Sequence, residues 1–168
     1  MILRPYKDVD AKTICSWIKD KKGFYQWSAA TMGEYPLTPQ KLVEHYNTKK
    51  DDTDYFVFCA CDDNGQVVGQ LIMRYPSADR QLIRFGYIIV NSEIRGKGYG
   101  KQMLSLAKEY AFKMLGAKRV TLGVFENNPS AMYCYRAVGL KESGEVNTYN
   151  INGEEWKCIE MVAQADAL

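Results

Sequence analysis

Glycine and basic residues alternate in one short segment, residues 95–101 (RGKGYGK), which follows an apolar run and precedes a helical pattern. Glycine lets a backbone approach an anion closely, and the free N–H groups of a helix's first turn favour negative charge together with the helix dipole. Arg95, Lys97 and Lys101 add formal positive charge to the same loop. The segment therefore predicts a binding site for a phosphate-containing ligand.

Three interpretations of this loop compete, because glycine-rich turns between a strand and a helix occur in unrelated folds. A Walker loop ends in Gly-Lys-Ser/Thr, whereas Gly98 follows the loop lysine here. A dinucleotide-binding loop has a third glycine where Met103 stands, and an acid about twenty residues later where Lys118 and Arg119 stand. The spacing excludes both nucleotide motifs. A glycine-rich surface turn that binds no ligand remains open.

A second motif lies downstream, where residues 128–131 (NPSA) are followed by Tyr135 and by the Gly-Leu pair 139–140. With the pattern Arg-x-x-Gly-x-Gly of residues 95–100, it resembles the two conserved blocks of the GNAT acetyltransferase superfamily. In the second block, a leucine replaces the usual aromatic residue after the last glycine. The resemblance is strongest over residues 82–140 and only topological elsewhere.

This resemblance implies that the chain uses acetyl-CoA as a cosubstrate and transfers its acetyl group to a primary amine of a small molecule or peptide. The amine attacks directly, so no protein nucleophile is expected among the five cysteines. By resemblance, strand residues pair with the pantetheine arm, the glycine loop holds the pyrophosphate, and a backbone N–H stabilises the developing oxyanion. The expected cofactor-binding residues are Ile88, Ile89, Val90, Arg95, Gly96, Lys97, Gly98, Tyr99, Gly100, Lys101 and Asn128.

Tyr135 is the expected catalytic residue, because its phenol can donate a proton to the departing CoA thiolate. A core tyrosine is the alternative. The general base is left unassigned: GNAT enzymes that acetylate protein N-termini often carry a Glu five residues before the Asn, and that position is Gly123 here. Looser candidates are a chain of water molecules and three acids, Glu126, Glu93 and Glu34.

Acceptor specificity is expected in the early part of the chain, as the resemblance implies. Four aromatic residues crowd a stretch without clear periodicity, namely Phe24, Tyr25, Trp27 and Tyr35. They suit a cleft for an apolar or cationic group. Ordinary core packing explains them equally well, so both interpretations remain open.

Hydrophobic periodicity predicts alternating strands and helices over residues 1–162. Strands are expected at residues 2–6, 55–61, 67–75, 82–90, 119–125, 142–149 and 154–162. Helices are expected from Asp8 to about Ile18 with Gly23 as the stop, and at residues 39–47, 99–115 and 129–137. Residues 163–168 are expected to form a C-terminal tail. The family resemblance makes this a single α+β domain with a mixed, mostly antiparallel central sheet flanked by helices.

Composition and charge limit the function classes. Hydrophobic residues make up 46% and charged residues 25% of the chain, as in ordinary globular proteins. A formal charge of +2 gives no strong field for nucleic acid or an anionic membrane, so neither is expected as a partner. The first residues contain no apolar stretch typical of a signal peptide, and a cytoplasmic protein is expected.

Five cysteines cannot all pair internally, and none forms a C-x-x-C motif, so reduced thiols and no metal site are expected. The oligomeric state is expected to be monomer or homodimer. Two functional alternatives remain: a non-catalytic acyl-CoA sensor, and a subunit whose main role is protein interaction.

Overall fold

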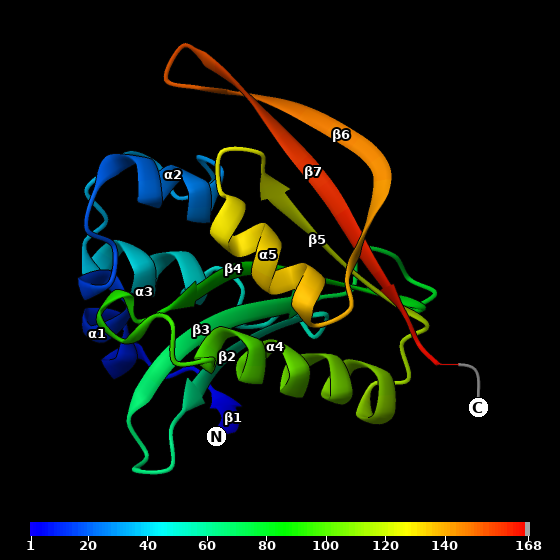
Figure 1. Ribbon diagram of the computed structural model, residues 1–168. Coiled ribbons are helices and arrows are strands. Elements are labelled where there is room, and N and C mark those ends of the chain that lie inside the picture. Colours follow the sequence, from blue (N-terminus) through cyan, green and yellow to red (C-terminus); the bar gives the residue numbers. More distant parts are fainter. Residues whose placement is uncertain (167–168) are drawn as a thin grey trace.

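The computed structural model describes residues 1–166, in which seven strands form one sheet with the order β1-β2-β3-β4-β5-β7-β6. Neighbouring strands are antiparallel except β4 and β5, which are parallel. The strands are β1 (Ile2–Pro5), β2 (Tyr55–Cys61), β3 (Val67–Arg74), β4 (Leu82–Val90), β5 (Arg119–Phe125), β6 (Lys141–Ile151) and β7 (Glu154–Gln164). The prediction of a mixed, mostly antiparallel sheet flanked by helices is confirmed (Figure 1).

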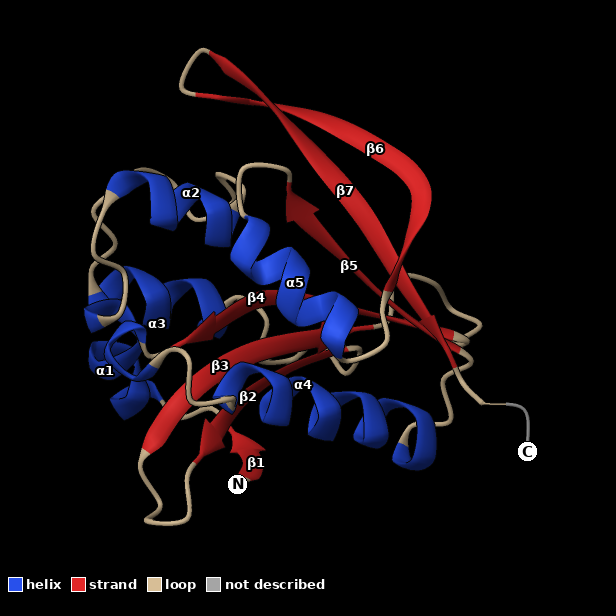
Figure 2. Ribbon diagram, in the orientation of Figure 1, coloured by secondary structure: helices blue, strands red, loops and turns tan. Residues whose placement is uncertain are grey.

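The helices cover both faces of the sheet (Figure 2). They are α1 (Ala11–Ser16), α2 (Lys21–Ser28), α3 (Pro39–Asn47), α4 (Tyr99–Glu109) and α5 (Pro129–Ala137). Helices α4 and α5 pack on one face over a core that includes Leu104, Leu122 and Met161. Helices α1 to α3 pack on the other face over a core that includes Ile14, Phe24 and Leu42. Within the described part of the chain, no helix has the length and apolarity needed to cross a membrane.

Local sequence signals place several helix starts as predicted. The Thr38 side chain accepts a hydrogen bond from the backbone N–H of Lys41 at 3.2 Å, and Pro39 occupies the first helical turn of α3. Asn128 caps α5 in the same way, with Pro129 in the first turn. Each cap satisfies a first-turn N–H that has no partner inside the helix, which sets where the helix begins.

The early helices differ from the prediction. Helix α1 ends at Ser16, and Gly23 lies inside α2 instead of stopping a helix. Asp20 explains the difference, because its carboxylate accepts a hydrogen bond from the N–H of Gly23 at 2.7 Å and caps α2. The stretch judged aperiodic therefore contains most of a helix.

Two further boundaries differ. The helix expected to reach Leu115 is α-helical only to Glu109 and continues as a π-helical turn over Tyr110–Met114. Strand β7 extends into the expected tail, since Ala163 and Gln164 pair with the start of β5.

Strands β4 and β5 separate after a short parallel ladder. They pair only at Leu82–Arg84, opposite residues 119–121. Beyond Arg84, β4 remains paired with β3 on its other edge, while β5 remains paired with β7 along its whole length. The edge of β4 that faces β5 is therefore left without a strand partner over its second half (Figure 1).

Candidate functional site

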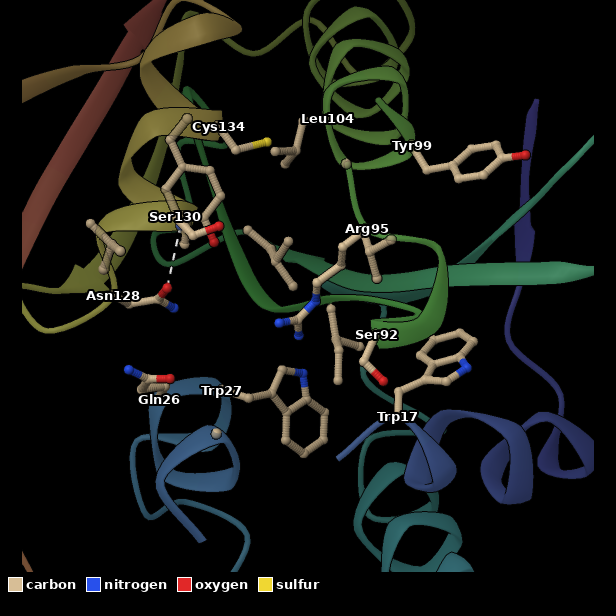
Figure 3. A pocket seen from close by; sticks show the side chains of 18 of the residues that line it. Trp17, Gln26, Trp27, Ser92, Arg95, Tyr99, Leu104, Asn128, Ser130 and Cys134 are labelled. Carbon is tan, nitrogen blue, oxygen red and sulfur yellow. Dashed lines mark hydrogen bonds between the residues drawn. The ribbon is translucent and has the colours of Figure 1, made fainter. Parts of the chain in front are cut away.

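A cleft of about 760 Å³ opens where β4 and β5 separate. Its lining comes from α2 and the turn before it, the second half of β4, the loop at 92–101, and α5 with the loop before it (Figure 3). The structure thus brings together segments that are far apart in the sequence.

The glycine loop forms one end of this cleft. Gly96 and Gly98 both have a φ of +81°, a left-handed conformation that other L-residues adopt only with strain. Gly98 is the N-cap residue of α4, and within the described residues no side chain caps this helix, in contrast with α2, α3 and α5. The first-turn N–H groups of α4 are therefore available to an anion.

Gly100 lets the first turn of α4 lie close to its neighbours. A Cβ atom at this position would stand 3.3 Å from the Cys134 sulfur and 3.6 Å from a methyl group of Val90. The absence of a side chain therefore brings the start of α4 against both β4 and α5.

Ile88, Ile89 and Val90 line the cleft from the side of β4. The pairing of β4 with β3 shifts register between Gln70 and Ile72, and Tyr87 in the irregular part has a φ of +46°. Bulges of this kind bend a strand and redirect its side chains, often next to functional sites. The bulge and the unpaired edge of β4 lie in the same stretch of strand, beside the cleft.

Tyr135 lines the cleft from α5 with a side chain that is only 7% exposed. Burial, with smaller contributions from Cys134 and Cys158, raises the pKa of its phenol well above the ordinary value. The phenol therefore keeps its proton at neutral pH and can act as a hydrogen donor. Tyr133 differs, since it is exposed and lies under the Lys101 ammonium, 5.0 Å from the ring centroid.

The loop before α5 is joined to α2 across the cleft. The Gln26 side chain donates to the backbone and side-chain oxygens of Asn127, both at 3.1 Å. Next to it, the Asn128 carboxamide oxygen accepts from the N–H of Ala131 at 3.3 Å, while the residue lines the cleft. Asn128 is thus held in place by its role as a helix cap.

Charged residues at the cleft are mainly basic. Lys19, Lys22, Arg95 and Lys101 line it, and Figure 3 shows the Arg95 side chain directed into it. Asp20 is the acid among the lining residues, and its carboxylate is occupied in capping α2. Such an arrangement favours an anionic ligand.

All of the predicted cofactor-binding and catalytic residues line the cleft except Lys97, which is exposed in the same loop. None of the three acids considered as a base lines the cleft. Glu126 lines a separate pocket, and Glu93 pairs with Lys19 at 3.8 Å. Glu34 lies in an exposed turn. The base therefore stays unassigned.

The aromatic residues expected at the acceptor wall divide into two groups. Trp27 lines the cleft, whereas Phe24 and Tyr25 are buried in the core and Tyr35 packs against that core partly buried. Sequence reasoning missed Trp17 and Gln26, which also line the cleft. For Gln26, Asp20 was the available signal, because recognising it as an N-cap would have predicted α2 and its exposed face.

The fold and the cleft define a class: an α+β domain with a strand edge and an uncapped helix N-terminus opening onto one cleft. The chain belongs to the acetyltransferase (GNAT) family, because the sequence model of that family matches residues 20–140. The predicted family is confirmed, and with it the prediction of a GNAT acetyltransferase.

Several relatives have names that specify an activity. A spermidine N(1)-acetyltransferase from Vibrio cholerae is 34% identical over 114 residues, which cover 67% of this chain and 65% of that protein. The chain therefore matches slightly less than two thirds of that relative's length. An uncharacterized N-acetyltransferase from Bacillus subtilis, YhfO, is 27% identical over 90% of this chain and 97% of its own.

Solved structures match over nearly the whole length. The crystal structure of spermidine N-acetyltransferase from Vibrio cholerae, in complex with CoA and spermine, has a TM-score of 0.81 and 23% sequence identity. The match covers 97% of this chain and 94% of that one. At this identity the likeness establishes the shared fold.

Proposed function

We propose that this protein transfers an acetyl group from acetyl-CoA to a primary amine of a small molecule or peptide by direct attack. The observation that carries the proposal is the combination, in one cleft, of an uncapped glycine-rich helix N-terminus and an unpaired strand edge. These features fit the two ends of an acyl-CoA, because one suits its diphosphate and the other suits its amide-containing pantetheine arm.

The proposed binding residues divide by chemistry. The amides and basic side chains of residues 95–101 hold the diphosphate, although Lys97 acts only through the field of its charge. Backbone groups of Ile88 and Val90 hydrogen-bond to the pantetheine arm as a neighbouring strand would. Asn128, fixed as a helix cap, faces the same ligand.

Acetyl-CoA supplies an activated thioester, so the protein needs to orient the amine and manage protons. We assign proton donation to the departing thiolate to the Tyr135 phenol, which burial keeps protonated. A backbone N–H on the free edge of β4 stabilises the oxygen that becomes negative during attack. Among the described residues that line the cleft, none offers a free carboxylate that could act as the base.

Without a carboxylate base in the described lining, the pKa of the acceptor amine decides how easily it reacts. Deprotonating a lysine-like amine at pH 7 costs about 4.6 kcal/mol, whereas a peptide α-amine costs about 1 kcal/mol. The proposal therefore favours amines of low pKa. Polyamines are the second candidate because of the names of the relatives. The basic lining of the cleft does not favour them.

A panel of amines incubated with acetyl-CoA tests the function, with product mass and released CoA thiol as readouts. The panel contains α-amino acid amides, short peptides, simple monoamines and spermidine. A product 42 Da heavier than one of these amines, about the mass of an acetyl group replacing a hydrogen, is the expected result. Acetyl-CoA binding without turnover of any amine would favour the sensor alternative, and a stoichiometric protein partner on purification would favour an interaction subunit.

The remaining proposals concern the state of the molecule. We propose that residues 1–164 work as one domain, two residues beyond the predicted limit of 162, because a single sheet includes strands from both ends of the chain and β7 runs to Gln164. A cytoplasmic location is supported by five free thiols, since such thiols stay reduced in that compartment. Monomer or homodimer is the proposed assembly, which light scattering of the purified protein measures directly.

A further inference from the structure

A bidentate ion pair between Arg84 and Glu160 crosses the sheet next to the cleft. The two terminal nitrogens of Arg84 on β4 donate to the two carboxylate oxygens of Glu160 on β7, at 2.7 and 2.9 Å. Their side chains are only 26% and 11% exposed. Paired hydrogen bonds of this kind fix both distance and orientation, and partial burial reduces screening by water.

The pair passes over β5 at Gly123. Strand β5 lies between β4 and β7, and Gly123 is the residue opposite Glu160 in the ladder. A Cβ at position 123 would stand 2.7 Å from the Cys158 sulfur, 3.1 Å from an Arg84 nitrogen and 3.2 Å from a Glu160 oxygen. The space above Gly123 is therefore filled by the Cys158 sulfur and the ion pair together. This is also a physical reason why position 123 carries no glutamate.

The pair lies at the point along the strands where the cleft begins. Arg84 is the last residue of β4 that pairs with β5, and the residues after it line the cleft. Gly123 lines the same cleft from β5. The ion pair thus ties β4 to β7, across β5, at the point where β4 and β5 begin to separate. The Asn147 carboxamide on β6 adds a contact to Glu160 at 3.4 Å.

We propose that Arg84 and Glu160 are positioning residues that set the separation of β4 and β5 and thereby the width of the acetyl-CoA cleft. The inference rests on the proposed function, because it assigns acetyl-CoA to that cleft. The pair acts through the free edge of β4: if the tie is lost, β4 moves relative to β5 and its backbone groups no longer align with one bound ligand.

Substitution of Glu160 by Gln tests the role, since it removes the charge with little change in shape. The expected result is an acetyl-CoA Kd by calorimetry that rises about tenfold, because binding must then restore the alignment of β4 that the lost hydrogen bond provided. KM for acetyl-CoA rises with it, while KM for the amine stays unchanged. A second variant, Gly123→Ala, keeps both charged residues but crowds them and the Cys158 sulfur with a methyl group, and it should weaken acetyl-CoA binding in the same direction.

Asp10→Asn is the matched control. The Arg4–Asp10 pair is also bidentate, with both contacts at 2.8 Å, and its residues do not line the cleft. This variant should lower the melting temperature as Glu160→Gln does and leave the acetyl-CoA Kd unchanged.

The outcomes separate this inference from the function on which it rests. If the wild-type protein binds no acetyl-CoA, the proposed function fails. If the wild type binds and both cleft variants bind equally well, the positioning role is refuted. It is refuted also if Asp10→Asn weakens binding as much, or if Glu160→Gln raises only the amine KM, which would place the pair in contact with the acceptor.

Discussion

Replacement of Gly98 by Ala tests the anion site most directly. Gly98 has a φ of +81°, and the nearest atom to an added Cβ is the Gln102 side-chain nitrogen at 4.0 Å. The substitution therefore causes no collision, and its effect is conformational. Holding a non-glycine residue in the left-handed region costs about 1–2 kcal/mol.

That cost should appear in the binding of acetyl-CoA. The loop at 95–98 is exposed and has room to leave the left-handed conformation when alanine is present. Binding must then restore the geometry that points the first amides of α4 at the diphosphate. A penalty of about 1–2 kcal/mol corresponds to a Kd raised about 5- to 30-fold, which isothermal calorimetry measures.

Gly144→Ala is the matched control for this prediction. Gly144 has a φ of +94° with no atom within 4 Å of an added Cβ, and it lies on the exposed strand β6, away from the cleft lining. Gly144→Ala should lower the thermal unfolding temperature, whereas Gly98→Ala, whose loop relaxes in the free protein, should lower it less. The reasoning is refuted if Gly98→Ala binds acetyl-CoA with the wild-type Kd, or if Gly144→Ala weakens binding equally.

Three further predictions follow from other residues. Tyr135→Phe should lower kcat about 10- to 100-fold with an unchanged acetyl-CoA Kd, at or below the lower end of the range for general acids because a thiolate is a stable leaving group. Steady-state assays that find wild-type turnover would remove its role. Asn128→Ala should lower the free energy of unfolding by about 1 kcal/mol through loss of the α5 cap, whereas Asn128→Asp should retain it, as urea denaturation would show. Burial alone would raise the pKa of the Asp10 carboxyl, but hydrogen bonds from Arg4 and the Lys7 backbone lower it overall. Its stabilising contribution is therefore present above about pH 4 and lost as the pH falls through the folded-state pKa, so urea midpoints should drop more between pH 5 and about pH 3 in the wild type than in Asp10→Asn.

Much of the fold could be predicted because its signals are local. Thr38-Pro39 and Asn128-Pro129 each combine a capping side chain with a first-turn proline, and both helices begin where these pairs stand. The Asn64-Gly65 turn likewise joins β2 and β3, with Gly65 at a φ of +79°. A cap or turn depends on residues within a few positions of one another, so the sequence alone reveals it.

The early helices show where local reasoning failed. The sequence predicts that Gly23 ends a helix, because glycine disfavours helix interiors. It lies instead in the first turn of α2, where its N–H donates a hydrogen bond to the Asp20 carboxylate. The aromatic residues of α2 were equally ambiguous. Whether Phe24 enters the core or Trp27 reaches the cleft depends on how α2 lies on the sheet.

The amino-acid sequence by itself was enough to predict the proposed chemistry: a helix start suited to an anion at residues 95–101, and a phenol at Tyr135, seven residues after the α5 cap Asn128. Tertiary structure decided where that chemistry meets. The cleft exists because β4 and β5 pair over three residues and then separate, and Arg84 meets Glu160 over Gly123 across 76 positions of sequence. Such contacts depend on strand order and register, which arise only when distant segments pack together.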